Sequence, residues 1–291
     1  MSVVLITGCS SGIGMAAALR FARNGDTVYA SMRDTARADK LRSAVAAAGL
    51  DVHLLELDVT RPATFGAVIQ QIVTESDRLD VLVNNAGVLR AGAFEDLEEA
   101  AIREVMETNF MGPFLLARAV LPQMRAQQGG CIIMISSLSG IAGLPGDVAY
   151  TASKFALEGA TEALRHEVDR WGIRLALVEG GLYATGIFTA SLPDQALLPP
   201  EYPADSPYRP LVEQRLLEVR DRLPEAMDPG IIGELLVRIA GSDGRQLRWP
   251  ADAVARKVLS AMFAQDDAQR DEFLRGVSGT DWWSEGRLGP G

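Results

Sequence analysis

The stretch VVLITGCSSGIG, residues 3–14, joins a run of aliphatic residues to a turn with three glycines and then to a helical pattern. Gly8 permits a tight turn from strand to helix, Gly12 lets the backbone approach a pyrophosphate, and Gly14 lets the helix pack close to the strand. The N–H groups and the positive dipole end at the start of that helix suit phosphate oxygens. A glycine-rich turn alone is a weak signal, but its place between the first strand and the first helix indicates a phosphate-binding site.

The pattern that starts with this turn continues over the first 180 residues, where short apolar runs alternate with longer helical patterns. The apolar runs are continuous, as in strands that are buried on both faces of a parallel sheet. The alternation predicts an α/β fold with a doubly wound parallel sheet of the Rossmann type, in a single domain over 1–291. The expected strands are Val3–Thr7, Thr27–Met32, Val52–Leu57, Val81–Asn84, Cys131–Ser136 and Arg174–Val178, and the expected helices cover about residues 13–24, 36–48, 62–76, 98–127 and 149–171.

The regular alternation stops near residue 182. Prolines recur throughout 182–250 and break its helical patterns, and only Val212–Leu223 keeps an amphipathic one. We therefore expect a Pro-rich insertion that lies over one edge of the sheet and has no core of its own. The rest of the chain is expected to form a helix at about 251–264, a short strand at about Glu272–Val277, and a peripheral tail, 278–291, whose Trp282 and Trp283 pack on a neighbouring surface.

Composition and charge exclude several classes of protein. The formal charge of −10, from 28 basic and 38 acidic residues, argues against a nucleic-acid partner. The two cysteines, Cys9 and Cys131, and the two histidines, His53 and His166, are too scattered for a metal site. No apolar run approaches the ~20 residues that a membrane span needs, and no charged leader precedes the first apolar run. We expect a cytoplasmic protein without a membrane span.

Tyr150 and Lys154 are four residues apart and therefore lie on one face of a predicted helix. A tyrosine with a pKa near ~10 is a poor acid or base at neutral pH, but a nearby ammonium stabilises the phenolate and lowers that pKa. Ser136, Ser137 and Ser139 follow the fifth strand, where a hydroxyl could hold a substrate oxygen on which charge develops. The chemistry alone does not select one of these serines.

Taken with the glycine turn, these residues resemble the motifs of the short-chain dehydrogenase/reductase family. The turn is similar to the family's TGxxxGxG coenzyme loop, and Tyr150 and Lys154 are similar to its YxxxK motif. Ser137 precedes Tyr150 by thirteen residues, which is the family's serine–tyrosine spacing. The resemblance implies an NAD(P)(H)-dependent oxidoreductase, in which hydride passes between nicotinamide and an alcohol or carbonyl carbon and Tyr150 is the general acid or base.

Further motifs in the family's order extend the resemblance over residues 7–185. Asn84-Asn85-Ala86-Gly87 resembles the NNAG motif beneath the cofactor, and Asn109 resembles the asparagine that holds a water in the proton path. The implied catalytic residues are Asn109, Ser137, Tyr150 and Lys154. The implied cofactor contacts are Gly8, Ser10, Ser11, Gly12, Ile13, Gly14, Arg33, Asp58, Val59, Asn85, Ala86, Gly87, Tyr150, Lys154, Gly181, Leu182 and Thr185.

The chain departs from the family after the sixth strand. The family usually has PGxxxT there, whereas this sequence has Gly180-Gly181-Leu182-Tyr183-Ala184-Thr185. Without the proline, we expect this loop to be more flexible in the unfolded chain and in the unliganded protein.

The end of the second strand bears on the choice of cofactor. A carboxylate there binds the ribose 2′-OH of NAD, whereas a basic residue favours the 2′-phosphate of NADP. Met32 takes the usual acidic position and Arg33 follows it, so NADP(H) is preferred, with Ser11 as a further donor. A strand that ended one residue later would present Asp34 and favour NAD(H). Asp58 resembles the residue that contacts the adenine amino group, but it could equally cap the next helix.

Within the family, the chain is most similar to the branch that contains 17β-hydroxysteroid and retinol dehydrogenases, and the expected strand at 272–276 also resembles that branch. The resemblance implies a small lipophilic substrate, a hydrophobic or aromatic secondary alcohol and its ketone, or an aldehyde. The segment 182–250 is expected to cover it. The expected substrate contacts are apolar: Leu138, Leu144, Val148, Tyr183, Ile187 and Phe188.

Several alternatives remain open at this point. An NAD-dependent alcohol dehydrogenase that works in the oxidation direction would share these motifs. A non-catalytic dinucleotide-sensing protein would usually lack the tyrosine or the lysine. An enzyme acting on nucleotide sugars is less consistent, because that branch resembles TGxxGxxG. The long helices 98–127 and 149–171 resemble those through which the family forms homodimers or homotetramers.

Overall fold

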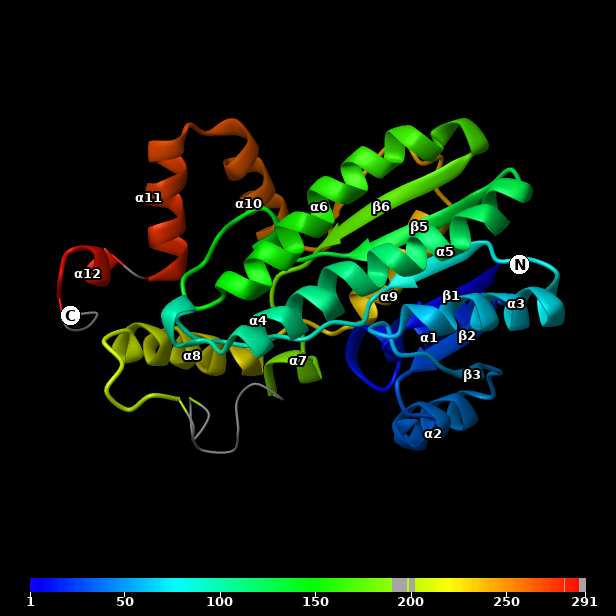
Figure 1. The fold of residues 1–291 in the computed structure, drawn as a ribbon, viewed down its shortest axis with the longest axis horizontal. Helices are drawn as coiled ribbons and strands as arrows, with labels where there is room; N and C mark the ends of the chain where they lie inside the picture. Colours follow the sequence, from blue (N-terminus) through cyan, green and yellow to red (C-terminus); the bar gives the residue numbers. More distant parts are fainter. Residues whose placement is uncertain (190–197, 199–201, 280, 288–291) are drawn as a thin grey trace.

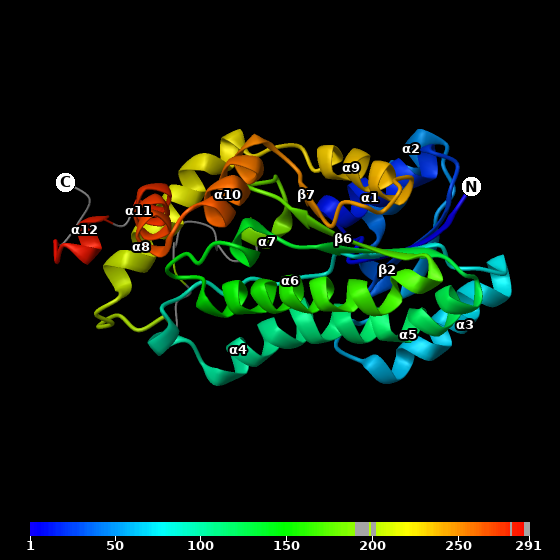
Figure 2. The same ribbon diagram turned by 90° about the horizontal axis from the view of Figure 1, so that it is seen from above.

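A seven-stranded parallel sheet lies between two layers of helices in the computed structural model of the protein, which describes residues 1–189, 198, 202–279 and 281–287 (Figures 1 and 2). The strand order is β3-β2-β1-β4-β5-β6-β7. The predicted doubly wound sheet is confirmed, and the order reverses between β1 and β4, where such sheets bind their ligands. The strands are β1 (Val3–Thr7), β2 (Thr27–Met32), β3 (His53–Glu56), β4 (Val81–Asn84), β5 (Gly130–Ile135), β6 (Ile173–Glu179) and β7 (Arg248–Pro250).

Helices cover both faces of the sheet because the central strands are apolar on both faces. Every residue of β1 and of β4 is buried. Figure 2 shows α3, α5 and α6 on one face and α1, α2 and α9 on the other. The helices are α1 (Gly12–Arg23), α2 (Asp39–Ala48), α3 (Phe65–Ser76), α4 (Glu99–Met106), α5 (Gly112–Ala126), α6 (Val148–Val168), α7 (Gly186–Thr189), α8 (Arg209–Arg222), α9 (Gly230–Ala240), α10 (Ala253–Ala264), α11 (Asp267–Ser278) and α12 (Asp281–Ser284).

The helix expected over 98–127 is interrupted in its middle. A π-helical turn, η4 (Glu107–Met111), separates α4 from α5. Pro113 has no N–H to donate to the carbonyl of Asn109, so the regular α-helical ladder fails at this point. Gly112 also lies so close to the backbone of Val59 that a side chain would not fit. Asn109 is thereby placed at an irregular turn inside a long helical segment.

The strand expected at Glu272–Val277 is wrong, because these residues belong to the helix α11. Asp266 and Gln269 form a capping box at its start, and Gly279 ends it in the left-handed conformation. The apolar residues 273, 274 and 277 have the spacing of a helix face, so the capping signal and the spacing agree. This segment therefore gives no support to the resemblance to the 17β-hydroxysteroid and retinol dehydrogenase branch, which depends on the other motifs.

Two elements inside the expected insertion 182–250 belong to the core. The helix α9 packs against α1, where Gly233 comes close to the backbone of Ala16. The strand β7 extends the sheet beside β6. Pro229 is one of the prolines that were expected to break helical patterns, but it stands directly before α9. Proline is well tolerated at the start of a helix, so it marks a beginning here rather than a break. Of the described residues in this range, those of α7 and α8 lie beyond the carboxyl ends of the strands (Figure 1).

The tail packs against the chain itself. Trp282, in α12, is buried, and its ring meets that of Trp283 edge-on with centroids 5.6 Å apart. Trp283 also faces Tyr208, which directly precedes α8. Within the described residues, no helix combines the length and apolarity needed to cross a membrane.

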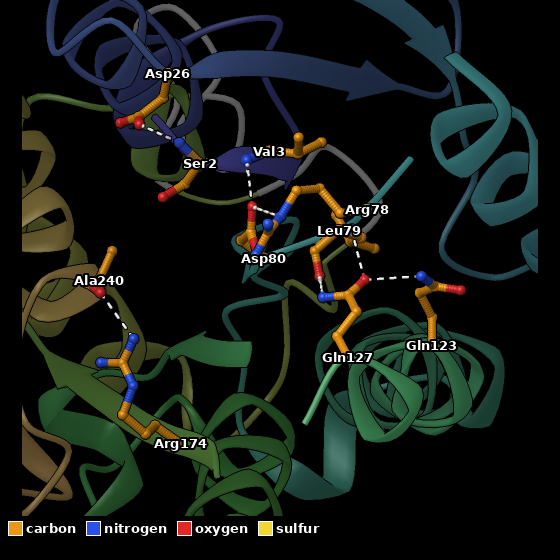
Figure 3. A network of polar contacts seen from close by, with 10 residues as sticks. All are labelled: Ser2, Val3, Asp26, Arg78, Leu79, Asp80, Gln123, Gln127, Arg174 and Ala240. Carbon is orange, nitrogen blue, oxygen red and sulfur yellow. Dashed lines mark hydrogen bonds and ion pairs between the residues drawn. The ribbon is translucent and has the colours of Figure 1, made fainter. Parts of the chain in front are cut away.

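Polar contacts hold together the amino ends of the strands, opposite the ligand-binding edge (Figure 3). Asp80 accepts hydrogen bonds from the Val3 backbone and from Arg78. Gln127, at the end of α5, pairs with both backbone groups of Leu79. These bonds connect β1, β4 and α5 to one another at the amino ends of the strands, away from the carboxyl ends where ligands bind.

Arg174 fastens α9 to the sheet at the same edge. From β6 it donates to the backbone carbonyls of Ile239, Ala240 and Ser242 over 2.8–3.1 Å. These carbonyls belong to the end of α9, where helices leave acceptors unpaired and a cation is favourable.

Replacing Arg174 with methionine should therefore lower the free energy of unfolding by about 2 kcal/mol, because the apolar stem remains and the charged donors are lost. Urea denaturation measures the change. Arg245→Met is the matched control, since this exposed arginine pairs with exposed Asp243 and its replacement should change stability by less than about 0.5 kcal/mol. Equal effects of the two substitutions would contradict the assignment.

Candidate active site

A cleft of roughly 390 Å³ opens at the carboxyl ends of the central strands, beside the point where the strand order reverses. It brings together most of the residues that the sequence assigned to cofactor and catalysis. Those that line it are Gly8, Ser10, Ser11, Gly12, Ile13, Arg33, Asp58, Val59, Asn85, Ala86, Gly87, Ser137, Tyr150, Lys154, Gly181, Tyr183, Thr185 and Ile187.

The glycine turn forms one wall of the cleft, and its glycines have different functions in the backbone. Gly8 and Gly12 adopt φ angles of 74° and 58°, in the left-handed region where a side chain is strained. A Cβ on Gly14 would overlap the carbonyl oxygen of Gly8, so only glycine lets α1 approach β1 this closely. Gly14 acts through this packing and is absent from the described lining of the cleft. The N-terminus of α1 is thereby aimed at the cleft.

Thr7 and Asn85 connect the turn to the loop after β4. The Thr7 hydroxyl accepts hydrogen bonds from the backbone N–H groups of Asn85 and Ala86, both at 3.0 Å. The Asn85 amide donates to the Thr7 carbonyl at 2.8 Å. The NNAG motif is therefore a structural partner of the glycine turn as well as part of the cleft wall.

Arg33 and Asp34, which follow β2, have different surroundings: Arg33 lines the cleft, and Asp34 caps the next turn. The described lining of the cleft includes Met32 and Arg33 but not Asp34. The Asp34 carboxylate accepts a hydrogen bond from the Ala36 backbone and caps the short 3₁₀ turn η1 (Thr35–Arg37). The basic residue is thus the charged group that β2 presents to the cleft.

Asp58 combines the two alternatives that the sequence left open. It lines the cleft, and its carboxylate also accepts hydrogen bonds from the backbone and the hydroxyl of Thr60, at 2.9 and 2.8 Å. Val59 lies beside it in the same wall. A cap and a cleft contact are therefore compatible at this residue.

Tyr150, near the start of α6, lies close enough to the Ser137 hydroxyl for that hydroxyl to lower the pKa of the tyrosine. Ser137 also accepts a hydrogen bond from the Ser139 backbone. Ser136, the other serine directly after β5, lines the cleft, but its hydroxyl oxygen is buried near Glu158. Its closeness to the tyrosine distinguishes Ser137 from Ser136 and Ser139. The chemistry of a hydroxyl group alone does not make that choice.

Lys154 lies one helical turn after Tyr150 and is buried. Its ammonium donates to the Ile135 carbonyl at 2.7 Å and stands 5.7 Å from the centroid of the Tyr150 ring. Burial lowers the pKa of Lys154 to about 8, against an opposing effect of Glu158. The ammonium is therefore held near the face of the tyrosine ring by the end of β5.

The pKa of Tyr150 is not lowered in the protein alone. Burial raises it to about 12, the bond from Ser137 lowers it, and the Asp147 carboxylate raises it further. The side chain is partly open to the cleft. The lowering of this pKa that is expected from the Lys154 ammonium stays a prediction.

Asn109 lies in the π-helical turn behind the cleft, with its side chain fully engaged. Its amide accepts from the Val88 backbone at 2.8 Å and donates to the Val88 carbonyl and to the Ser153 hydroxyl at 2.9 and 3.2 Å. The residue therefore connects the loop after β4 to α6. A water bound at Asn109 would have to use its backbone carbonyl.

Asp252 holds the loop after β6, which lacks the usual proline. Its carboxylate accepts hydrogen bonds from the Gly181 backbone, the Tyr183 hydroxyl and the Ala255 backbone at 2.8–3.1 Å. Met227 adds two backbone bonds to the same loop. These contacts hold the loop in place of the proline, and the greater flexibility expected for it stays a prediction. Asp252 precedes a helix and could have been recognised as a cap, but its reach to Gly181 could not.

The residues expected to contact substrate are only partly assembled. Tyr183 lines the cleft with its hydroxyl turned toward Asp252, and Ile187 lines it from α7. Leu138 packs instead with residues of α10 and α11. Of the remaining expected substrate contacts, Leu144 and Val148 are absent from the described lining, with Val148 41% exposed, and the side chain of Phe188 lies outside the described residues. Leu182, which was expected to contact the cofactor, is also absent from that lining.

Comparison with known proteins places the chain in a family. A family model described as short chain dehydrogenase matches residues 2–196. The chain is 35% identical to the uncharacterized oxidoreductase YusZ of Bacillus subtilis, covering 85% of this chain and 88% of that one. It is 36% identical to 17-beta-hydroxysteroid dehydrogenase type 1 of Mus musculus (85% and 73%) and 35% identical to retinol dehydrogenase 8 of Bos taurus (84% and 80%).

Solved structures agree with these relatives. A short-chain dehydrogenase from Streptomyces avermitilis superposes with a TM-score of 0.76 at 31% identity, over 96% of this chain and 98% of the other. A metagenomic short-chain oxidoreductase in complex with NADP superposes with a TM-score of 0.66 at 26% identity, over 86% and 95%. The chain therefore belongs to the short-chain dehydrogenase family of NAD(P)-dependent oxidoreductases and resembles its hydroxysteroid and retinol dehydrogenase members.

Proposed function

We propose that this enzyme reduces a hydrophobic or aromatic ketone or aldehyde to its alcohol with NADPH, and that Tyr150 is the general acid. The observation that carries the proposal is that Ser137 and Tyr150 lie close together beside buried Lys154, in the same cleft as the glycine turn. We propose the reducing direction because the Tyr150 hydroxyl, whose pKa burial raises to about 12, is available as a proton donor at neutral pH. A protonated phenol is suited to donate to a carbonyl oxygen.

We propose that the cleft holds the dinucleotide, because the residues that line it are those expected to bind each part of the cofactor. The open backbone at Gly8 and Gly12 leaves room for a pyrophosphate at the N-terminus of α1. Ser11 and Arg33 would hold the adenosine phosphate, Asp58 and Val59 the adenine, and Asn85 to Gly87 the cofactor's underside. Gly181, Leu182 and Thr185 would hold the carboxamide, and Lys154 the ribose. When bound, the reduced nicotinamide supplies the hydride.

The side chains of the protein supply position and the proton. Ser137 and Tyr150 would both bond the carbonyl oxygen, which fixes it in the cleft and stabilises the negative charge that develops there. Tyr150 would then release its proton to that oxygen. The positive charge of Lys154 would favour the phenolate that remains, and Asn109 would support proton return through a water on its backbone carbonyl.

The proposed substrate class has limited but consistent support. The relatives named above are a 17-beta-hydroxysteroid dehydrogenase and a retinol dehydrogenase, whose names denote large apolar alcohols. We propose that Leu138, Leu144, Val148, Tyr183, Ile187 and Phe188 contact the substrate, with α7 and α8 covering it. Two of these, Tyr183 and Ile187, line the described cleft.

NAD-dependent oxidation is the second candidate function. It would require Asp34 to meet the ribose, and the cap that this residue forms on η1 weighs against it.

We also propose a homodimer or homotetramer through α5 and α6, since Phe155 of α6 leaves 45% of its surface exposed.

Changing Tyr150 to phenylalanine should reduce turnover by about 10²- to 10⁴-fold, because the proton donor is removed while the ring remains. Oxidation of NADPH, followed by its absorbance with a panel of lipophilic ketones, gives the rate, and fluorescence titration gives cofactor affinity, which should stay within about threefold. Tyr29→Phe is the control, since this tyrosine bonds Glu75 and Ser76 away from the cleft. Near-normal turnover in Tyr150→Phe would refute the mechanism.

Changing Arg33 to alanine should weaken NADPH binding by about 10- to 100-fold and leave NADH binding nearly unchanged, because only NADPH carries the phosphate that pairs with the guanidinium. Titration of both cofactors against the variant measures the two effects. Arg37→Ala is the control, because Arg37 follows in η1 and is absent from the described lining of the cleft. A wild-type protein that binds NADH more tightly than NADPH would favour the oxidative alternative.

A further inference from the structure

Buried polar atoms gather on the side of Lys154 that faces away from Tyr150. Ser136, Glu158 and Glu179 are 6%, 3% and 0% exposed. Within the described part of the chain, the Ser136 hydroxyl, one oxygen of Glu158 and both oxygens of Glu179 have no hydrogen-bond partner. Three side chains with that many unpaired oxygens are costly in a protein interior, so the cluster calls for a functional explanation.

Four elements of the core assemble this cluster. Glu158 lies one helical turn after Lys154 on the same face of α6. Glu179 ends β6, and Ser136 follows β5, the strand that pairs with β6. Gly140 closes the cluster from the cleft side, where a Cβ would stand 2.7 Å from the Ser136 hydroxyl and 3.3 Å from the Glu158 carboxylate.

Carboxylates outnumber cations in and around this cluster: Glu158, Glu179 and Glu162 stand against Arg248 and Lys154. Arg248, on β7, donates to Glu158 at 2.9 Å and to Glu162 at 2.7 Å, so its guanidinium is already shared by two carboxylates. The charged groups that face Glu158 are Arg248 and Lys154, and those that face Glu179 are Glu158 and Arg248. Two ionised carboxylates at this depth would repel each other with little solvent to separate them.

The protonation states follow from these neighbours. Burial, followed by the Glu158 charge, raises the pKa of Glu179 to about 8. Burial also raises the pKa of Glu158, and Ser136, Arg248 and Lys154 lower it. The Trp249 backbone and the Ser136 hydroxyl lie near enough to affect these values, although neither completes a bond of good geometry. At neutral pH, burial and the Glu158 charge therefore favour the neutral form of Glu179, while Arg248 and Lys154 favour the ionised form of Glu158.

We infer that Glu158 and Glu179 share a single proton and together keep the Lys154 ammonium charged, Glu158 as the counter-charge and Glu179 as the neutral member of the pair. Both are positioning residues, since they act on the reaction through Lys154. The inference rests on the proposed role of that lysine. Glu158, Arg248 and Glu162 also form a chain of contacts from the lysine to the surface, because the Glu162 side chain is 54% exposed.

The shared proton can be tested without turnover, through the pH dependence of folding. Glu179 has a higher pKa in the folded protein than its ordinary value of 4.5, so the folded state binds more protons and stability falls as pH rises from 4.5 toward 8. Glu179→Gln removes that loss. The folding constant of this variant relative to wild type should rise by about tenfold per pH unit between pH 5 and 8, measured by urea denaturation.

Glu162→Gln is the control for this measurement, because it removes an exposed carboxylate that contacts the same Arg248 and leaves the buried pair intact. A flat ratio for Glu179→Gln would overturn the shared proton. Neither result depends on the substrate or on Tyr150, so the outcome stands even if the proposed reaction is wrong.

The effect on Lys154 can be tested through the pH dependence of turnover. Glu158→Gln should shift the basic limb of the kcat profile to lower pH by about one unit, because the lysine loses its counter-charge and its pKa falls. Glu158→Asp should restore most of the shift. The double variant Glu158→Gln/Glu179→Gln should shift further than Glu158→Gln, since Glu179 can otherwise ionise in place of Glu158.

A purely structural role predicts a different result. It would lower kcat by the same factor at every pH and leave the limb in place, and that outcome would overturn the inference. If instead no ketone is reduced by any form of the enzyme while the folding measurement shows the slope, the proposed reaction fails and the proton pair remains.

Discussion

The site depends on one backbone contact, the close approach of Gly14 to the carbonyl of Gly8. A side chain at position 14 would overlap that carbonyl, so only glycine allows α1 to pack directly against β1. This packing fixes the N-terminus of α1 at the point where the strand order reverses. The free N–H groups at that terminus create a local positive potential without any charged side chain. Thr7 and Asn85 then join the same turn to the loop after β4, so both walls of the cleft share one frame.

A second constraint is the concentration of polar groups along one face of α6. Tyr150, Lys154 and Glu158 follow one another at a helical turn's spacing, and each is buried or half-buried beneath the sheet edge. In such a place, burial disfavours charge on every group, and it accordingly raises the pKa of the tyrosine and lowers that of the lysine. The chain alone therefore keeps the phenol protonated, and its surroundings determine how easily the lysine stays charged.

The C-terminal part of the chain completes the site from a distance. Asp252 caps α10 and also holds Gly181 and Tyr183, so a helix after the last strand sets the shape of the loop after β6. Arg248 of β7 reaches Glu158 on α6 in the same way. The tail adds Trp282 and Trp283 near the start of α8. These contacts explain how a loop without the usual proline can still be ordered.

The sequence by itself determined the strands of the first 180 residues, because continuous apolar runs bounded by turns have few other folds open to them. It also determined the glycine turn and the spacing of Ser137, Tyr150 and Lys154, since these depend on local geometry along one strand end and one helix. It was wrong at Glu272–Val277, where a capping box outweighs β-propensity, and it missed α9 and β7, whose burial depends on α1 and β6. Only the tertiary structure decided that Arg33 rather than Asp34 faces the cleft, that Asp252 replaces a proline, and that Glu158 and Glu179 meet behind Lys154. Each of these depends on side chains from elements far apart in the chain, and their distances are set by packing of the whole sheet rather than by any local pattern.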